Sequence, residues 1–230
     1  MHSSSVVRFP FSIVVMLVTL LSLAGNSQGA DEKIARPVKL IFDTDMGNDI
    51  DDALALGVIH ALQSRGECEL LAVTLSKDND FAGPFVDLVN TFYGRGNIPI
   101  GVVRNGKTPE DSRYLTEPVK AMDNGQQRYP HDLLSGKDAP EAVGLLRKIL
   151  AEQPDGSVAL CVVGFSTNAT RLLDSTPDKF SPLTGKELVT RKVSVLSMMA
   201  GMFSQTGPNM PRVRRRTAAC DLYQRNQTDV

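Results

Sequence analysis

Residues 38–63 read VKLIFDTDMGNDIDDALALGVIHALQ: a short apolar run, an acidic loop and an amphipathic segment in direct succession. The run Val38–Phe42 is typical of a strand that is buried in a sheet. Residues 51–63 place apolar side chains at helical spacing behind two acids, and acids favour the first turn of a helix. The stretch therefore predicts a strand, a loop and a helix, the opening unit of an α/β domain.

The same alternation continues along the chain. Further strands are predicted at 70–75, 98–103, 158–163 and 192–198, and helices at 85–93, 141–153 and near 167–173. The stretch from 104 to 140 is polar and rich in Gly, Pro, Asp and Asn, so we expect a long loop with some local helix there. Apolar strands that alternate with helices predict an α/β fold with a mostly parallel sheet and helices on both faces. Such sheets bind ligands at the carboxyl ends of their strands.

The N-terminus has the pattern of a secretory signal peptide over residues 1–30. A basic start precedes the apolar run 11–24 and a small, polar stretch that ends at Ala30. We expect cleavage near Ala30 and a secreted or periplasmic protein without membrane attachment; an uncleaved N-terminal anchor is the alternative. The formal net charge of −1 and the absence of Trp argue against a nucleic-acid partner.

The acidic loop carries more carboxylates than a helix cap needs. Six of the ten residues from 43 to 52 offer a side-chain oxygen: Asp43, Asp45, Asn48, Asp49, Asp51 and Asp52. Carboxylates crowded at one strand end raise each other's pKa, and a hard cation removes that cost by supplying the opposite charge. An EF-hand is excluded, because a loop counted from Asp43 has its glycine one place early and Leu54 at its twelfth position.

The whole segment resembles the opening signature of the inosine-uridine-preferring nucleoside hydrolase family, Asp-x-Asp-Pro-Gly-x-Asp-Asp-Ala. This chain has Met46 in place of the proline, and the spacing from Gly47 to the Asp51-Asp52 pair is longer by two residues. Mg²⁺-dependent haloacid-dehalogenase-type phosphatases also begin with a buried strand and Asp-x-Asp. They remain an alternative, although Met46-Gly47 and the separate Asp51-Asp52-Ala53 helix start do not belong to their pattern.

Three later stretches, 73–79, 162–168 and 192–203, are similar to the family in their order and spacing. The resemblance implies a nucleoside hydrolase-like domain with a Rossmann-like core over residues 37–207. The family's leaving-group His and the metal-binding Asp that follows it belong to a C-terminal segment, and no His follows His131 here. We therefore expect a C-terminally incomplete domain. Residues 208–230 are expected to form an irregular basic tail, which a frameshift or a truncation would explain.

The resemblance also implies a reaction, the hydrolysis of the N-glycosidic bond of a small ribonucleoside to free base and ribose. Its cofactor would be Ca²⁺, bound by Asp45, Asp52 and the backbone carbonyl of Val163. Asp45 would also be the general base that activates the attacking water. Asp43 would orient the other carboxylates from behind without binding the ion itself.

Three further residues are expected to contact substrate. Asp51 and Asn79 would bind the ribose, and His131 lies in the long loop that could cover the base. A turn residue is the alternative for Asn79, and a solvated loop residue is the alternative for His131. Because the C-terminal His and Asp are missing, a ribose- or metal-binding remnant without turnover is the alternative to an enzyme. The sequence leaves a homo-oligomer open.

Overall fold

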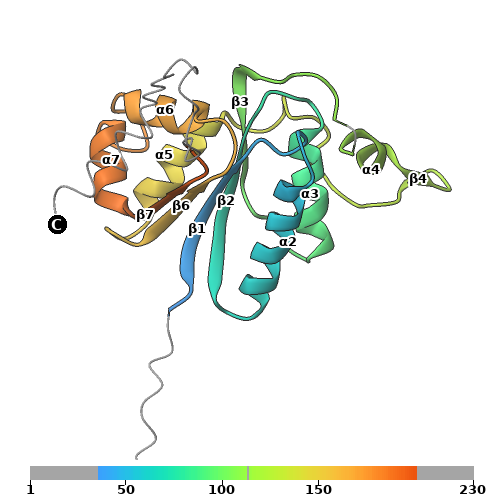
Figure 1. Cartoon of the computed structure of the whole chain (residues 1–230), viewed down its shortest axis with the longest axis horizontal. Coiled ribbons are helices and arrows are strands. Elements are labelled where there is room, and N and C mark those ends of the chain that lie inside the picture. Colours follow the sequence, from blue (N-terminus) through green and yellow to red (C-terminus); the bar gives the residue numbers. More distant parts are fainter. Residues whose placement is uncertain (1–35, 113, 201–230) are drawn as a thin grey trace, which may run out of the picture. The chain divides into compact units, whose positions relative to one another are not determined.

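The computed structural model describes residues 36–112 and 114–200, and its centre is a five-stranded sheet (Figure 1). The strands lie in the order β3-β2-β1-β6-β7. Their bounds are β1 (Val38–Thr44), β2 (Cys68–Lys77), β3 (Ile100–Lys107), β6 (Val158–Val162) and β7 (Val193–Met198). All four pairings between them are parallel, which confirms the predicted parallel sheet. The expected signal peptide and the basic tail lie outside the described residues.

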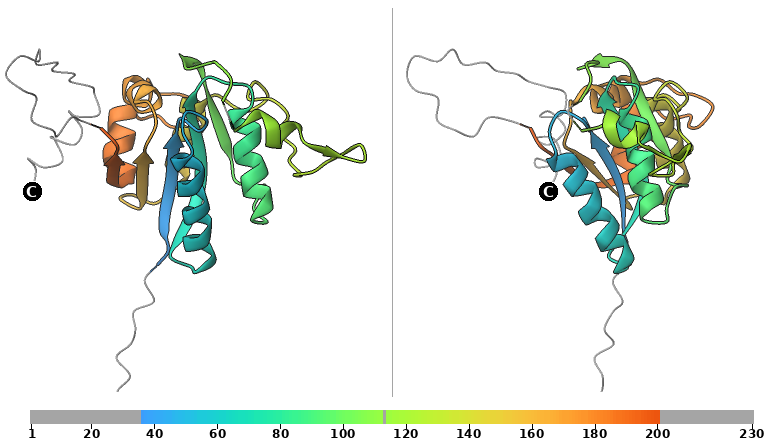
Figure 2. Two further views of the ribbon diagram at one scale, coloured as in Figure 1. Left: turned by 45° about the vertical axis from the view of Figure 1, so that its right-hand side comes forward. Right: turned by 90° about the vertical axis from the view of Figure 1, so that its right-hand side faces the viewer.

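Helices cover both faces of this sheet, as predicted (Figures 1 and 2). One layer holds α2 (Asp51–Ser64), α3 (Ala82–Phe92) and α4 (Thr116–Lys120), and the other holds α5 (Ala142–Glu152), α6 (Thr167–Asp174) and α7 (Gly185–Lys192). Neighbouring strand residues point to opposite faces, so Phe42 joins the core below α2 and α3 while Ile41 joins the core below α5, α6 and α7. Within the described part of the chain, no helix is long and apolar enough to cross a membrane.

The strand order determines where a ligand can bind. From β1 the chain moves through β2 to β3 at one edge, and it later returns to β6 on the other side of β1. The direction of winding therefore reverses between β1 and β6. In open parallel sheets, the crevice outside the carboxyl ends of the strands at such a reversal is the usual ligand site. The loops that follow β1 and β6 meet at this point.

Several element boundaries differ from the sequence predictions for identifiable reasons. Strand β3 begins at Ile100 instead of 98, since Pro99 has no N–H to donate and only its carbonyl pairs, accepting from the Val73 N–H at 3.0 Å. The long polar loop contains α4, as expected, and also a hairpin of β4 (Met122–Asp123) and β5 (Gln126–Gln127). Helix α7 was not predicted, although a complete capping box between Thr184 and Glu187 marks its start.

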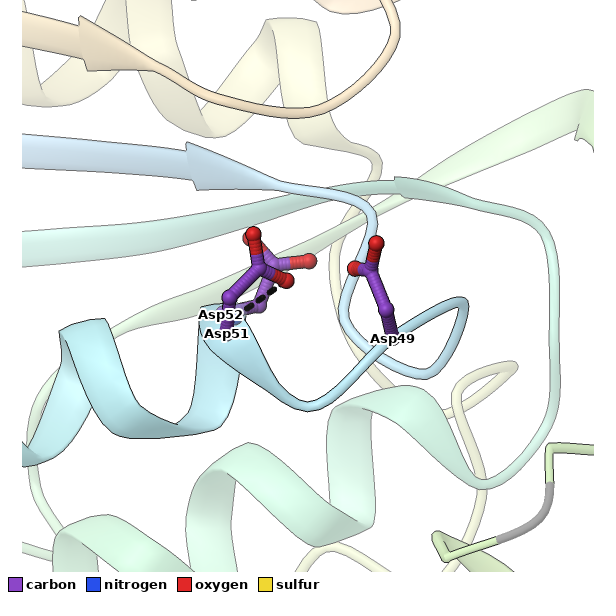
Figure 3. Close-up of side chains that lie close together, drawn as sticks. All are labelled: Asp49, Asp51 and Asp52. Carbon is purple, nitrogen blue, oxygen red and sulfur yellow. Dashed lines mark hydrogen bonds between the residues drawn. The ribbon is translucent and has the colours of Figure 1, made fainter.

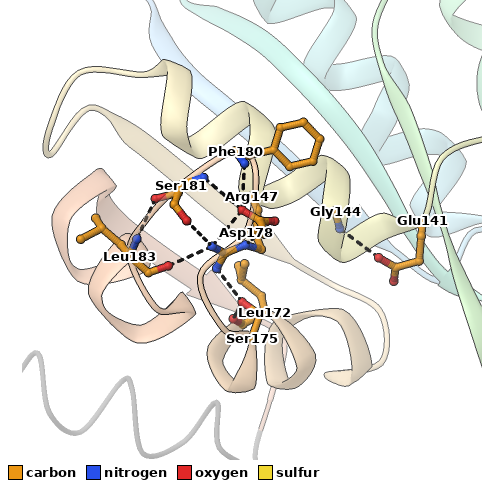
Figure 4. A network of polar contacts seen from close by, with 9 residues as sticks. All are labelled: Glu141, Gly144, Arg147, Leu172, Ser175, Asp178, Phe180, Ser181 and Leu183. Atoms are coloured by element: carbon orange, nitrogen blue, oxygen red, sulfur yellow. Dashed lines mark hydrogen bonds and ion pairs between the residues drawn. The ribbon is translucent and has the colours of Figure 1, made fainter.

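A buried arginine fixes the segment between α6 and α7 (Figure 4). Arg147 projects from α5, and its guanidinium donates two hydrogen bonds to the Asp178 carboxylate, at 2.8 and 3.1 Å. It also donates to the Ser175 hydroxyl at 2.8 Å and to the Ser181 and Leu183 carbonyls at 3.2 and 2.9 Å. One side chain therefore ties α5 to the whole connection that leads into α7.

Candidate functional site

Three carboxylates converge where the acidic loop enters α2 (Figure 3). Asp49 comes from the loop, and Asp51 and Asp52 come from the first turn of the helix. One carboxylate oxygen from each lies within 4.8 Å of the others. Two oxygens that bind one Ca²⁺ at about 2.3–2.6 Å can be up to about 5 Å apart, so this spacing suits a single hard cation. The sequence named Asp49 only as one of six residues with a side-chain oxygen, and the structure places it with Asp51 and Asp52.

The electrostatics of the cluster also suit a cation. Burial, together with the negative charges of Asp45 and Asp51, raises the pKa of Asp52 to about 7. The Asp52 Oδ2 atom is buried and has no hydrogen-bond partner among the described residues. The pKa of the exposed Asp49 is raised as well, chiefly by its contact with Asp51. A positive ion would relieve these repulsions and give the orphaned Asp52 oxygen a partner.

Asp45, the predicted general base, is held by a short polar relay. The Asn48 side-chain amide donates to the Asp45 carboxylate at 2.6 Å. The Lys77 ammonium donates in turn to the Asn48 side-chain oxygen at 3.1 Å and to the Thr108 carbonyl at 2.6 Å. Lys77 is buried, and burial lowers its pKa. The relay holds the Asp45 carboxylate, whose charge acts on Asp52. The sequence named Asn48 only as one of six oxygen-bearing residues, and it gave Lys77 no site role.

Asp43 lies behind this cluster and is completely enclosed. Its Oδ2 atom accepts hydrogen bonds from the Thr74 hydroxyl at 2.6 Å and from the Asn168 side-chain amide at 2.8 Å. Burial raises the pKa of Asp43 to about 7, against the opposing effect of these two hydrogen bonds. Because Thr74 belongs to β2 and Asn168 to α6, Asp43 joins three elements below the site. Its role in orienting the other carboxylates stays a prediction.

The loop after β6 packs directly against the acidic loop. The Val163 N–H donates to the Asp43 carbonyl at 2.8 Å. A Cβ atom at Gly164 would lie 2.4 Å from the Asp45 nitrogen and 2.6 Å from the Thr44 carbonyl carbon, so only glycine fits there. The Ser76 hydroxyl donates to the Thr44 carbonyl at 3.2 Å. Val163, a predicted metal ligand through its backbone, therefore lies beside the acidic loop.

Tyr114 holds the acidic loop from the other side. Its hydroxyl accepts a hydrogen bond from the Gly47 N–H at 2.8 Å and donates one to the Asp49 carbonyl. Its ring packs edge-on against Phe85, with 5.5 Å between the ring centres. Burial raises the pKa of Tyr114 to about 12, so the hydroxyl keeps its proton near neutral pH. No sequence pattern pointed to this residue, because it lies in the long polar loop.

Tyr114→Phe is expected to loosen the acidic loop without disturbing the packing of the ring. The change leaves the Gly47 N–H without an acceptor, so we expect a loss of about 1–3 kcal/mol in the free energy of unfolding. Amide hydrogen exchange should become faster at Gly47. The matched control is Tyr93→Phe, since the Tyr93 ring stacks on His60, away from the acidic loop. Equal rates of amide hydrogen exchange at Gly47 in the two variants would show that Tyr114 does not hold the acidic loop.

Asn79, a predicted substrate contact, is hydrogen-bonded within its own turn and to the loop after β3. The Asn79 side-chain amide donates to the Pro109 and Glu110 carbonyls at 3.0 and 3.3 Å, and its oxygen accepts from the Phe81 N–H at 2.9 Å. This pattern favours the turn-residue alternative.

His131 is buried, not solvated. Its ring lies 2.7 Å from the Tyr129 carbonyl and 3.4 Å from the Gln127 amide. Its polar contacts within residues 36–112 and 114–200 are thus with its own hairpin region. The structure brings together Asp43, Asp45, Asp51, Asp52 and Val163 of the predicted set, and it does not bring His131 to them.

Comparisons with known proteins bear mainly on the fold. No model of a known protein family matches the chain, and no curated protein sequence matches it. Among solved structures, the type III effector protein XopQ, complexed with adenosine diphosphate ribose, is 19% identical over 76% of this chain and 46% of that chain, with a TM-score of 0.52.

The effector protein XOO4466 is 17% identical over 85% of this chain and 51% of that chain, with a TM-score of 0.53. A plant nucleoside hydrolase is 22% identical over 72% and 48%, with a TM-score of 0.45. The chain thus spans about half the length of the structures it matches. The likeness to the two effectors supports the α/β fold class that the sheet topology shows.

Proposed function

We propose that this protein binds the ribose of a nucleoside through a calcium ion held by the acidic loop, and that it hydrolyses the N-glycosidic bond. The convergence of the Asp49, Asp51 and Asp52 carboxylates carries this proposal. They lie at the strand reversal where such sheets bind ligands. The sequence resemblance to nucleoside hydrolases supports the same reading. So does the ribose-containing ligand of XopQ, a protein of similar fold.

The residues present suit a hard divalent cation, because all of the charged donors are carboxylates. Asp45, Asp52 and the Val163 carbonyl would hold the ion, and Asp49 would add a further carboxylate. When bound, the ion supplies positive charge that attracts the two ribose hydroxyls and favours ionisation of water. Asp43 and the relay from Lys77 through Asn48 would keep these carboxylates in place.

The chain's own groups would perform the proton transfers. Asp45 would accept a proton from the attacking water as the water oxygen bonds to the anomeric carbon. Asp51 would accept a hydrogen bond from a ribose hydroxyl. The bond from the anomeric carbon to the base breaks, and the base leaves with the electron pair. No described histidine contacts the acidic loop, so we expect leaving groups that are stable as anions to depart fastest.

The same lack of a contacting histidine favours a second candidate function, a ribose- and metal-binding module without turnover. Ribose release separates the two candidates. The purified chain would be incubated with inosine, uridine and a nitrophenyl riboside, with Ca²⁺ or with a chelator. If the protein is an enzyme, we expect calcium-dependent release of ribose, fastest from the nitrophenyl riboside. Binding without release would identify the module, and neither binding nor release would contradict both.

Calcium affinity is expected to rise with pH. Asp43 and Asp52 each have a pKa raised to about 7 in the metal-free fold, above the ordinary value of 3.8. Their protonated forms are favoured by burial, so the metal-free protein loses stability as the pH rises through about 7. Calcium needs the ionised form of Asp52, so its affinity should fall about tenfold per pH unit below that pKa. Calorimetric titrations at acid, neutral and alkaline pH check this, and a constant affinity would contradict it.

A further inference from the structure

A second feature lies on the other side of the contact between the loops after β1 and β6. It is an open cavity of about 520 Å³. It is lined by the apolar Phe165 and by Lys107, Gly164, Ser166, Thr167, Thr170 and Arg171. Lys107 ends β3, and the others belong to the β6–α6 loop and the first turns of α6. The cavity therefore opens at the same edge of the sheet as the acidic loop, and the function proposed above gives it no role.

The charge of the cavity lining is positive. Neither Lys107 nor Arg171 forms a salt bridge within the described ranges. The Arg171 guanidinium donates to the Arg104 and Asn105 carbonyls at 2.6 and 3.1 Å, which fixes its position but leaves its charge uncompensated. Asp78 is the acidic residue next to Lys107, since its N–H donates to the Lys107 carbonyl. The Asp78 carboxylate accepts a hydrogen bond from the Gly106 N–H at 2.8 Å. An anion in the cavity would therefore lie near two positively charged side chains, Lys107 and Arg171.

The lining also offers hydrogen-bond donors that suit phosphate oxygens. The hydroxyls of Ser166, Thr167 and Thr170 make no hydrogen bond to any part of the chain that the structure describes. Ser166, which precedes α6, does not cap the helix with its side chain. The first N–H groups of α6 therefore add partial positive charge to that of Lys107 and Arg171. Phosphate accepts such charge-assisted and hydroxyl hydrogen bonds well.

The cavity adjoins the acidic loop through a single residue. Gly164 lines the cavity, and the space for a side chain at Gly164 is filled by the backbone of Thr44 and Asp45. The acidic loop and the cavity are therefore neighbours that meet at Gly164. The acidic loop repels anions, so a phosphate would gain most from the cations on the far side of Gly164.

We propose that this cavity binds the phosphate of a nucleoside 5′-phosphate, so that phosphorylated ribosides are preferred over free nucleosides. The inference rests on the proposed calcium and ribose site, because the acidic loop must hold the sugar. An uncharged nucleoside would leave Lys107, Arg171 and the three hydroxyls without a ligand group. A phosphorylated riboside would place its ribose at the acidic loop and its phosphate in the cavity.

The test is a calorimetric titration of the full chain, with Ca²⁺, by adenosine 5′-monophosphate, adenosine and inorganic phosphate. We expect the monophosphate to bind about tenfold or more tightly than adenosine, which corresponds to about 1.4 kcal/mol. Lys107→Gln should weaken the monophosphate about 3- to 10-fold and leave adenosine unchanged, as expected for the loss of one charge-assisted contact. The control Lys148→Gln, an exposed lysine of α5, should change neither affinity.

The remaining outcomes separate the two proposals. If adenosine binds with Ca²⁺ and the monophosphate binds no more tightly, the cavity proposal is overturned and the ribose site stands. Inorganic phosphate that binds as tightly as the monophosphate also overturns it, because the riboside then contributes nothing. If Lys107→Gln weakens the monophosphate while a chelator changes neither ligand, the cavity binds phosphate but the calcium site fails, and the riboside proposal that rests on that site is overturned.

Discussion

Asp45→Asn is expected to lower the rate of ribose release by about 10²- to 10⁴-fold, the usual contribution of a general base. The amide has the size of the carboxylate and can still accept the hydrogen bond from Asn48, so the fold should survive. It cannot accept a proton from water near neutral pH. The measurement is kcat with a nitrophenyl riboside at saturating Ca²⁺, which separates a lost base from weakened ion binding.

The control for this variant is Asp132→Asn, which removes an exposed carboxylate from the long polar loop. We expect its kcat to stay within about twofold of the unchanged chain, because surface carboxylates far from the chemistry contribute little. Retention of most of the activity by Asp45→Asn would assign the proton transfer to another group. In that case Asp45 would be at most a ligand of the ion.

Arg147→Met is expected to lower the free energy of unfolding by about 1–3 kcal/mol, the usual cost of leaving buried hydrogen-bonding groups without a partner. The Arg147 side chain is 3% exposed, and it makes all of the contacts drawn between α5 and the segment before α7 (Figure 4). Its guanidinium also lowers the pKa of Asp178. Without it, the Ser181 and Leu183 carbonyls lose their donors.

Urea denaturation at neutral pH measures this loss. The matched control is Arg128→Met, because Arg128 and Asp123 form a similar two-point pair with side chains that are 51% and 56% exposed. Solvent screens that pair, and its removal should leave the free energy of unfolding almost unchanged. Equal losses in the two variants would show that the buried network contributes no more than a surface pair.

The elements that the sequence predicted well are those whose pattern is local. The apolar run in β1 and the acid-led helical period of α2 placed both elements within a few residues of their observed bounds. Helix α7 escaped prediction because its few apolar residues make a weak pattern, although its capping box is visible in the sequence. The buried end of β2 was missed because burial of Lys77 depends on Asn48 and on the Thr108 carbonyl, which are distant in the chain.

The candidate site divides in the same way. Asp43, Asp45, Asp51 and Asp52 could be placed from the sequence, since each follows directly from where β1 ends and α2 begins. Tyr114 could not, because it reaches Gly47 across 67 residues from a loop with no regular pattern. His131 was predicted to contact substrate because it lies in the long loop. In the structure its ring contacts Gln127 and Tyr129 instead. Tertiary contacts, not local sequence, decide such positions.

A crystal structure of the chain grown with Ca²⁺ and adenosine tests the calcium and ribose site most directly. The expected result is one ion bound by the Asp45, Asp49 and Asp52 carboxylates and the Val163 carbonyl, with the ribose hydroxyls completing its coordination at about 2.3–2.6 Å. An acidic loop that binds no ion under these conditions, or a ribose bound away from Asp51 and Asp52, would contradict the proposed function.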